Sequence, residues 1–278
     1  ETLHGAVINC DHDESNSNVS TIGFILSCVD NGLSDYHNIY NTTVEGFTFK
    51  VAREDISGSY IRFITDDSDL NANYYNFIIR NIKATNTKDG QGQIVDFGKP
   101  LHNSVIDNIE ANYGQYAVYI EVEGSNTKIS NIISNNCTYG ICSYSYVDMS
   151  NVLIHYGDDI DLVNLWNLST NLLNISAIAS TELNNISLDI THSGEKEYLP
   201  DGDYPVPFIK LESPNEDKAE IKVNNLKFPN FVQNFTALTD RYLFSWIDSP
   251  ILSIAPNGVE ESDKLKLFTN LGSTDEYG

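Results

Sequence analysis

Carboxylate side chains recur in the middle of the chain, and they are the residues best suited to carry chemistry. A pair of carboxylates can cleave a glycosidic bond, one as general acid and the other as general base, when about 6.5–9.5 Å separates them in an inverting enzyme. No GxGxxG, GxxxxGK[ST], HExxH or GxSxG pattern points to another kind of active site. The candidate catalytic residues are therefore Glu121, Glu123, Asp158, Asp159 and Asp161.

Strand alternation predicts that most of these acids share an outer face. If Val118, Ile120 and Val122 point into a core, then Tyr119, Glu121 and Glu123 point outward. The same parity gives the outward positions of the next two segments: Cys142, Tyr144, Tyr146, Asp159 and Asp161. Neighbouring coils lie about 4.8 Å apart, so the backbones of Glu121 and Asp161 are expected about 10 Å apart.

Three tyrosines on this predicted face are candidate glycan-binding residues: Tyr119, Tyr144 and Tyr146. Aromatic rings stack on the faces of sugars, but tyrosine also packs along strands and at subunit interfaces. The aspartates likewise have an alternative interpretation, as a solvated acidic turn. Both alternatives stay open at this point.

A short recurring phrase marks the elements that must position these residues. It reads apolar, any, Asn, apolar, any, small or apolar, and its asparagines are Asn81, Asn108, Asn131 and Asn151, at steps of 27, 23 and 20 residues. An earlier copy carries Gly46 in place of Asn. Later copies are expected at Asn174, which keeps the period, at Asn185, in a second strand of the same coil, and around residues 223–228. Such a period indicates stacked coils.

A second series of strands alternates with the first. After each asparagine phrase comes a glycine turn and then an expected strand, over residues 94–97, 117–122, 141–146 and 160–165. Two strand families in constant order predict an all-β fold, a parallel β-helix with coils of about 20–27 residues. The asparagines should lie at bends, adopt the left-handed conformation and bond to one another between coils.

The repeat divides the chain into two expected parts. Residues 1–192 form the β-helix, with early strands at 5–10, 21–28, 43–51 and 60–65, and the clearest repeats lie in 76–192. Seven of the eight prolines occur from Pro200 onward, so 193–278 should hold terminal coils, with strands near 208–211, 220–228 and 242–247, and a capping or oligomerisation region. We expect a fragment of a longer chain.

Composition excludes several classes of function. The chain has 39 acidic and 16 basic residues, a net charge of −23, which disfavours binding to nucleic acid or anionic membranes. The chain contains no run of 18 apolar residues, so insertion into a membrane is not predicted. The six histidines show no metal-ligand spacing, so no cofactor is expected, and a bound divalent cation is not indicated. Cys137 and Cys142 are interpreted as small core residues, with pairing across a turn as the alternative.

The interleaved Asn-Ile and Tyr-Gly phrases resemble the right-handed parallel β-helix of the pectin-lyase-like superfamily. Within it, the Asn- and Tyr-rich, Met-poor composition and ragged loops resemble a bacteriophage tailspike or adsorption appendage. The segment from Tyr156 to Asp161 is also similar to the Gly-Asp-Asp strand of polygalacturonases, although their companion Asn-Thr-Asp, Gly-His-Gly and Arg-Ile-Lys segments are absent.

This resemblance implies a homotrimer in the extracellular virion tail, joined to other tail proteins, that binds and could depolymerise a host surface polysaccharide or teichoic acid. One alternative is a secreted pectinase-like hydrolase or lyase, and another is a non-enzymatic β-solenoid adhesin. A trimeric mass in solution would separate the spike from a monomeric secreted enzyme.

Overall fold

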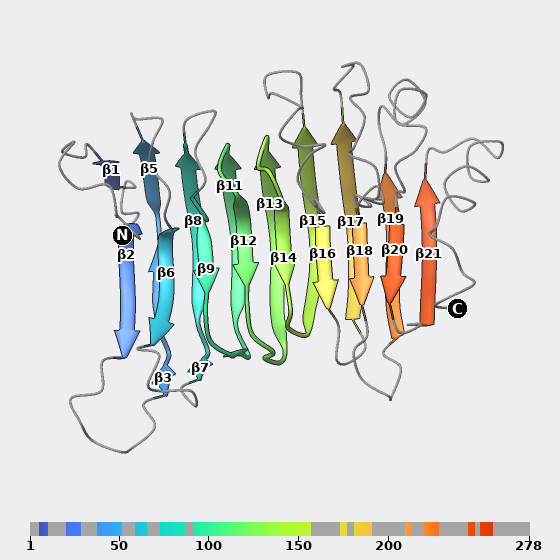
Figure 1. Ribbon diagram of the computed structural model, residues 1–278, viewed down its shortest axis with the longest axis horizontal. Helices are drawn as coiled ribbons and strands as arrows, with labels where there is room; N and C mark the ends of the chain where they lie inside the picture. Colours follow the sequence, from blue (N-terminus) through green and yellow to red (C-terminus); the bar gives the residue numbers. More distant parts are fainter. Residues whose placement is uncertain are drawn as a thin grey trace, which may run out of the picture.

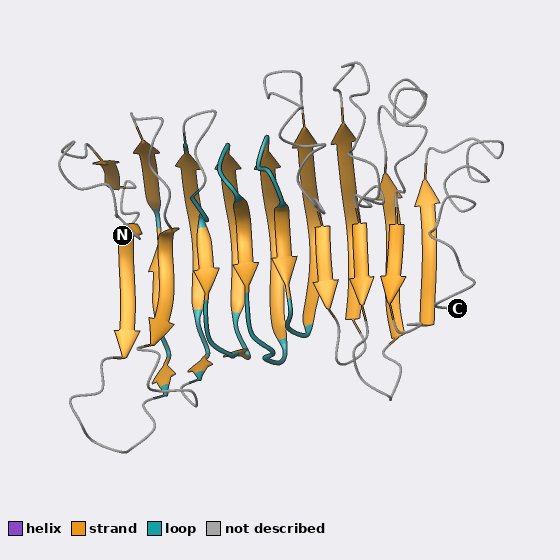
Figure 2. Cartoon of the chain, in the orientation of Figure 1, coloured by secondary structure: helices purple, strands orange, loops and turns teal. Residues whose placement is uncertain are grey.

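Parallel strands stack into three sheets in the computed structural model of the chain (Figure 1). The structure describes residues 6–10, 21–28, 38–51, 59–65, 73–86, 92–156, 173–176, 181–190, 209–212, 220–227, 244–247 and 251–257. Strands and loops make up all of these residues (Figure 2). Within them, no helix is long and apolar enough to cross a membrane.

Two long sheets and one short sheet share the strands. Sheet 1 contains β1 (Ala6–Cys10), β4 (Thr43–Glu45), β5 (Phe47–Val51), β8 (Ile78–Thr85), β11 (Val105–Asn112), β13 (Thr127–Asn135), β15 (Val147–Tyr156), β17 (Thr181–Ile190), β19 (Glu220–Lys227) and β21 (Ile251–Asn257). Sheet 2 contains β2 (Thr21–Cys28), β6 (Ser59–Thr65), β9 (Val95–Phe97), β12 (Tyr116–Ile120), β14 (Gly140–Ser143), β16 (Leu173–Ser176), β18 (Ile209–Glu212) and β20 (Phe244–Ile247). Sheet 3 contains β3 (Ile39–Tyr40), β7 (Tyr74–Tyr75) and β10 (Leu101–His102).

The chain visits the sheets in a repeating order. It passes from β8 in sheet 1 to β9 in sheet 2 and β10 in sheet 3, and then returns to sheet 1 as β11, which pairs in parallel with β8. Each coil therefore adds a strand beside its predecessor, and the coils progress along the long axis from one terminus to the other (Figure 1). The predicted all-β fold with parallel strands is confirmed.

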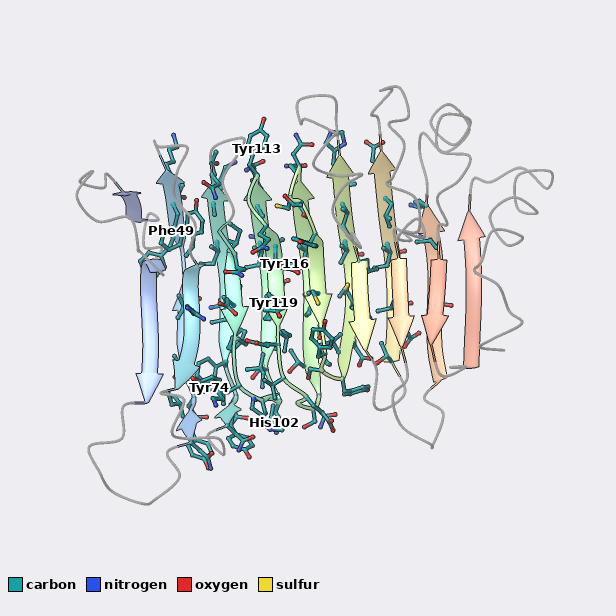
Figure 3. The ribbon with its side chains drawn as sticks, in the orientation of Figure 1. Phe49, Tyr74, His102, Tyr113, Tyr116 and Tyr119 are labelled. Atoms are coloured by element: carbon teal, nitrogen blue, oxygen red, sulfur yellow. The ribbon has the colours of Figure 1, made fainter. Side chains whose placement is uncertain are left out.

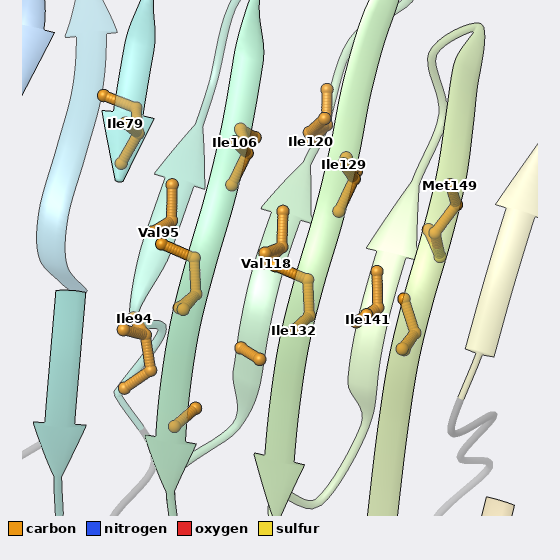
Figure 4. Packing of buried hydrophobic residues seen from close by; sticks show 14 of the residues in the cluster. Ile79, Ile94, Val95, Ile106, Val118, Ile120, Ile129, Ile132, Ile141 and Met149 are labelled. Carbon is orange, nitrogen blue, oxygen red and sulfur yellow. The ribbon is translucent and has the colours of Figure 1, made fainter. Parts of the chain in front are cut away.

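The core lies between sheets 1 and 2 and consists of columns of like residues, one per coil (Figure 4). One column in sheet 1 is formed by Ile79, Ile106, Ile129, Met149 and Leu183, each at most 1% exposed. The facing column in sheet 2 is formed by Ile61, Val95, Val118, Ile141 and Leu173. Each such side chain contributes about 1.5–3 kcal/mol through burial.

The asparagine of the recurring phrase bends each sheet 1 strand. In β11, Ile106 and Ile109 are both buried although they are three residues apart, because Asn108 between them adopts φ of 53° and lies outside the pairing register. Asparagine tolerates this left-handed conformation better than most residues. Gly46 holds the same place between β4 and β5 with φ of 78°, as predicted.

These bends are linked from coil to coil by side-chain hydrogen bonds. We call the set the asparagine ladder: Asn81, Asn108, Asn131, Asn151, Asn185 and Asn225, all with φ between 53° and 57°. The amide of Asn108 donates to Asn81 Oδ1 over 2.8 Å, and that of Asn185 donates to Asn151 Oδ1 over 3.0 Å. The ladder is interrupted once, where Asn131 donates to Asp107 Oδ1 over 2.7 Å instead. The predicted structural role of these asparagines is confirmed.

A second series of left-handed asparagines precedes the strands of sheet 1. It comprises Asn41, Asn76, Asn103 and Asn126, with φ between 50° and 59°. Asn76 donates to Asn41 over 3.0 Å and Asn126 donates to Asn103 over 3.2 Å. Each coil from Asn76 to Asn131 therefore has two asparagine corners, and the bonds between coils help to hold successive turns in register.

The period of the phrase fails after Asn151. Asn174 lies in β16 of sheet 2 beside Cys142, and Asn185 in β17 is the residue bonded to Asn151. Asn174 and Asn185 do lie in two consecutive strands, as predicted. The strand expected at 160–165 lies outside the described residues, and the strand that pairs with β14 is β16. An insertion lengthens this coil, so the step between ladder asparagines becomes 34 residues.

The sheets continue beyond the clearest repeats. The expected strands near 208–211, 220–228 and 242–247 correspond to β18, β19 and β20. The outermost strand of sheet 1, β21, contains Pro256, as expected for a proline at the edge of a sheet. The capping or oligomerisation role of residues 193–278 stays a prediction.

Replacing Asn151 tests the asparagine ladder. Alanine at this position should lower the free energy of unfolding by about 2–3 kcal/mol, because it loses the bonds to Asn131 and Asn185 and strains a φ of 55°. Glycine should cost only about 1 kcal/mol, since it adopts this φ freely and loses only the bonds. Urea denaturation followed by circular dichroism measures both. Equal losses of unfolding free energy in the two variants would show that the left-handed backbone conformation does not contribute to the cost of the alanine substitution.

Candidate functional site

The predicted outer face is the solvent side of sheet 2. One row of this face runs across β6, β9, β12 and β14, and the pairing register places Arg62, Asp96, Tyr119 and Cys142 in successive positions. Val118 and Ile120, on either side of Tyr119, are completely buried. The predicted inward and outward parity of β12 is therefore correct around Tyr119.

Four tyrosines gather on this face, and we call them the tyrosine surface: Tyr116, Tyr119, Tyr139 and Tyr144. The ring of Tyr116 stacks on Tyr119 and on Tyr139, with centroid distances of 4.7 Å in both cases and interplanar angles of 18° and 16°. Tyr144 is the most open, at 38% exposed, and lies close enough to affect the ionisation of Tyr116 and Tyr119. Figure 3 shows Tyr116 and Tyr119 together on β12.

Two members of this surface were missed in the sequence. Strict alternation from Tyr119 would place Ala117 outward and Tyr116 inward. A register shift between Tyr116 and Val118 reverses this order, so Ala117 is buried and Tyr116 stacks on Tyr119. The recurring Tyr-Gly turn phrase, which contains Tyr139, was the available signal for the ring that stacks on Tyr116.

Burial raises the pKa of the central tyrosines above the ordinary tyrosine value. Desolvation is the largest cause that raises the pKa of Tyr116, and the pKa of Tyr119 rises for the same reason, with a further contribution from the charge of Glu121. Their hydroxyl groups therefore stay protonated near neutral pH and can both donate and accept hydrogen bonds. Such a surface can pack against a sugar ring and bond to its hydroxyl groups.

The described acids differ in exposure. Glu121 and Glu123 are exposed in the segment that follows β12, and Glu121 lies near Tyr119. Val122, expected in the core, is partly exposed because β12 ends at Ile120. Asp96 is the buried carboxylate of the row, with its side chain 5% exposed, and it forms an ion pair with Arg62 at 3.1 Å. Sequence parity alone had not singled out Asp96.

Tyr146, the remaining described candidate, lies between β14 and β15. Tyr146 is partly exposed and lies near Asp148 and Glu182; burial is the largest cause that raises its pKa, and these two acids add to it. Asp158, Asp159 and Asp161 lie outside the described residues. Their predicted alignment with Glu121 and their catalytic role therefore stay predictions.

The two described cysteines are free and buried, so the alternative of a Cys137–Cys142 disulfide is not realised. Cys137 belongs to the core, and burial raises the pKa of its thiol to about 12. Cys142 shares the outward register of Tyr119 but is only 3% exposed, contrary to the expected open position. Its thiol lies near Tyr116 and Tyr119.

A second aromatic surface lies on sheet 3. Tyr40, Tyr75 and His102 stack on successive coils, with centroid distances of 5.0 and 4.8 Å. His102 also contacts Ser125 Oγ at 2.8 Å and Asn73 Oδ1 at 3.1 Å, and burial lowers the pKa of its imidazole. Tyr40 is 55% exposed at the end of this stack.

No cluster of three or more His, Cys, Asp or Glu side chains suited to a metal ion occurs in the part of the chain that the structure describes. Comparison of the chain with protein-family models, with curated proteins and with solved structures finds no match. The class of protein is therefore defined by its architecture, an all-β chain of stacked parallel strands with aromatic surfaces on its outer faces.

The raised tyrosine pKa values predict a loss of stability in alkaline solution. An unfolded tyrosine ionises near pH 10, whereas Tyr116 and Tyr119 in the folded chain hold their protons to higher pH. Between those two pKa values the unfolded state binds fewer protons, so the free energy of unfolding falls as the pH rises above about 10. Tyr116→Phe and Tyr119→Phe should each make this fall shallower in urea denaturation across pH. If the unfolding free energy of the variants falls with pH as steeply as that of the parent protein, the raised pKa values of Tyr116 and Tyr119 are not the cause of the alkaline loss of stability.

Proposed function

We propose that the protein is a right-handed parallel β-helix of the pectin-lyase-like kind and acts as a bacteriophage receptor-binding appendage. Its tyrosine surface binds a polysaccharide or teichoic acid on the host cell. In this proposal the chain assembles as a homotrimer in the virion tail and joins other tail proteins. The repeated coil order, the asparagine ladder and the outward tyrosines support it.

The observation that carries the proposal is the stack of Tyr119, Tyr116 and Tyr139 beside the exposed Tyr144. Aromatic rings already held by stacking lose little further freedom when a ligand binds, so more of the contact energy appears as affinity. Their hydroxyl groups remain available to polar partners on a sugar. Rigid, amphipathic rings on a regular sheet are well suited to a chain of repeating saccharide units.

Depolymerisation is a further part of the proposal and depends on the carboxylates. Glu121 or Glu123 would act as one member of an acid–base pair, and Asp158, Asp159 or Asp161 as the other. Glu121 supports this in one respect, because it is exposed beside Tyr119. Shortening of purified host glycan, measured by size-exclusion chromatography, tests this part separately from binding.

Replacing single tyrosines tests the binding proposal. Tyr119→Ala and Tyr144→Ala should each weaken binding to a host glycan about tenfold, since each removes part of the platform. Biolayer interferometry against surface polysaccharides and teichoic acids from a panel of bacteria measures the affinity. Tyr40→Ala is the matched control, because it removes an exposed stacked tyrosine from sheet 3, and it should leave the affinity unchanged.

Two results would contradict the proposal. If Tyr40→Ala weakens binding while Tyr119→Ala and Tyr144→Ala do not, the glycan binds at sheet 3. If no glycan of the panel binds the parent protein, the receptor-binding function itself is wrong. Circular dichroism spectra of the variants show whether each retains its sheet structure.

A further inference from the structure

Positive charge is scarce in the chain that forms the tyrosine surface. From Pro100 through Glu195, the sequence contains one Lys or Arg, which is Lys128, and eleven Asp and Glu residues. Lys128 lies in β13 of sheet 1, and the tyrosine surface belongs to β12, β14 and the residues beside them in sheet 2. The strands that carry these tyrosines thus bring no cation of their own.

Three cations on neighbouring coils are already paired, whereas Lys99 follows β9, two residues beyond Phe97, whose carbonyl oxygen accepts a hydrogen bond from the Glu121 N–H. Arg62, in the same row as Tyr119, forms an ion pair with the buried carboxylate of Asp96. On sheet 1, Arg80 pairs with Glu45, and Lys83 pairs with Glu110 at 2.5 Å. An anionic glycan would therefore meet the two exposed carboxylates of Glu121 and Glu123, against the single positive charge of Lys99 on the neighbouring coil.

The same features favour a positively charged group. The face of an aromatic ring is electronegative and attracts an ammonium ion, with a gain of about 0.5–2 kcal/mol that depends on desolvation. Glu121 adds a full negative charge two residues after Tyr119, where its side chain is exposed and its N–H is bonded to the Phe97 carbonyl of the neighbouring coil. Ring and carboxylate therefore attract the same kind of group at one place.

We propose that the tyrosine surface selects saccharides with free, protonated amino groups over their N-acetylated and acidic counterparts. The ammonium group pairs with the carboxylate of Glu121, and the sugar ring packs on the rings of Tyr119 and Tyr144. This inference rests on the proposed glycan-binding function and narrows it to amine-bearing polymers. It disfavours polymers whose only charges are phosphates or carboxylates.

Oligosaccharides of equal length test the selectivity: β-1,4-linked glucosamine, N-acetylglucosamine and galacturonic acid. The glucosamine oligomer should bind at least about tenfold more tightly than the N-acetylated oligomer, with an affinity that falls as salt is added. Glu121→Gln should remove most of this preference. Glu182→Gln is the control, because it removes the same charge from an exposed position on sheet 1 and should leave the preference intact.

An oligolysine of the same charge separates recognition from general attraction to an acidic protein. Tyr119→Ala should weaken binding of the glucosamine oligomer more than binding of oligolysine, because only the sugar ring also packs on Tyr119. Equal losses of preference in Glu121→Gln and Glu182→Gln, or equal effects of Tyr119→Ala on both cationic ligands, would overturn the inference.

The failure of the inference is distinguishable from failure of the proposed function. If the N-acetylated or acidic oligomer binds as tightly as the amine, and Tyr119→Ala weakens that binding, glycan recognition stands and amine selectivity is wrong. If none of the three oligomers binds and the host glycans also fail to bind, the proposed function is wrong, and the inference that depends on it is wrong as well.

Discussion

The hydrogen bonds between left-handed asparagines on successive coils are the interaction on which the rest of the structure depends. Asn81, Asn108, Asn131, Asn151 and Asn185 each turn the chain at an equivalent point, and their side chains bond along the stack. Because a strand that slips by one residue exchanges its inner and outer faces, a fixed corner in each coil fixes both faces at once. The buried isoleucine columns and the outward tyrosines are two results of that single constraint.

The tyrosine surface combines this regular register with one departure from it. Regular alternation places Tyr119 outward between the buried Val118 and Ile120. The register shift next to Val118 then turns Tyr116 to the same side, where it stacks on Tyr119 and Tyr139. β-Bulges commonly redirect a side chain near a functional site, and here the result is a preformed aromatic platform on an otherwise regular sheet. The acidic residues of the same coils give that platform a charge preference.

Sequence patterns predicted the fold well where they depended on local chemistry. Asparagine at the bends, glycine at position 46 and apolar residues at the inner positions each follow from the backbone or packing requirements of one coil. The count of residues between coils failed after Asn151, because an insertion of any length can separate two equivalent strands. The period of the phrase pointed to Asn174 as the next position, whereas Asn185 is the residue that bonds to Asn151.

The candidate site shows the same division. Tyr119 and Tyr144 were predicted from parity within single strands, and the structure brings them together with Glu121. Tyr116 depended on a bulge, and Asp96 depended on its pairing with Arg62 on another coil, so neither could be found by alternation alone. The stack of Tyr40, Tyr75 and His102 joins residues from three coils and likewise has no signature within any one of them.

The central claim is that the tyrosine surface of sheet 2 is where a glycan binds. A crystal structure of the protein with a bound saccharide of the glycan it recognises tests this claim most directly. We predict that the sugar rings lie over Tyr116, Tyr119 and Tyr144, with polar groups of the sugar bonded to the tyrosine hydroxyls and to Glu121. A saccharide bound instead over Tyr40, Tyr75 and His102, with the tyrosine surface unoccupied, would contradict it.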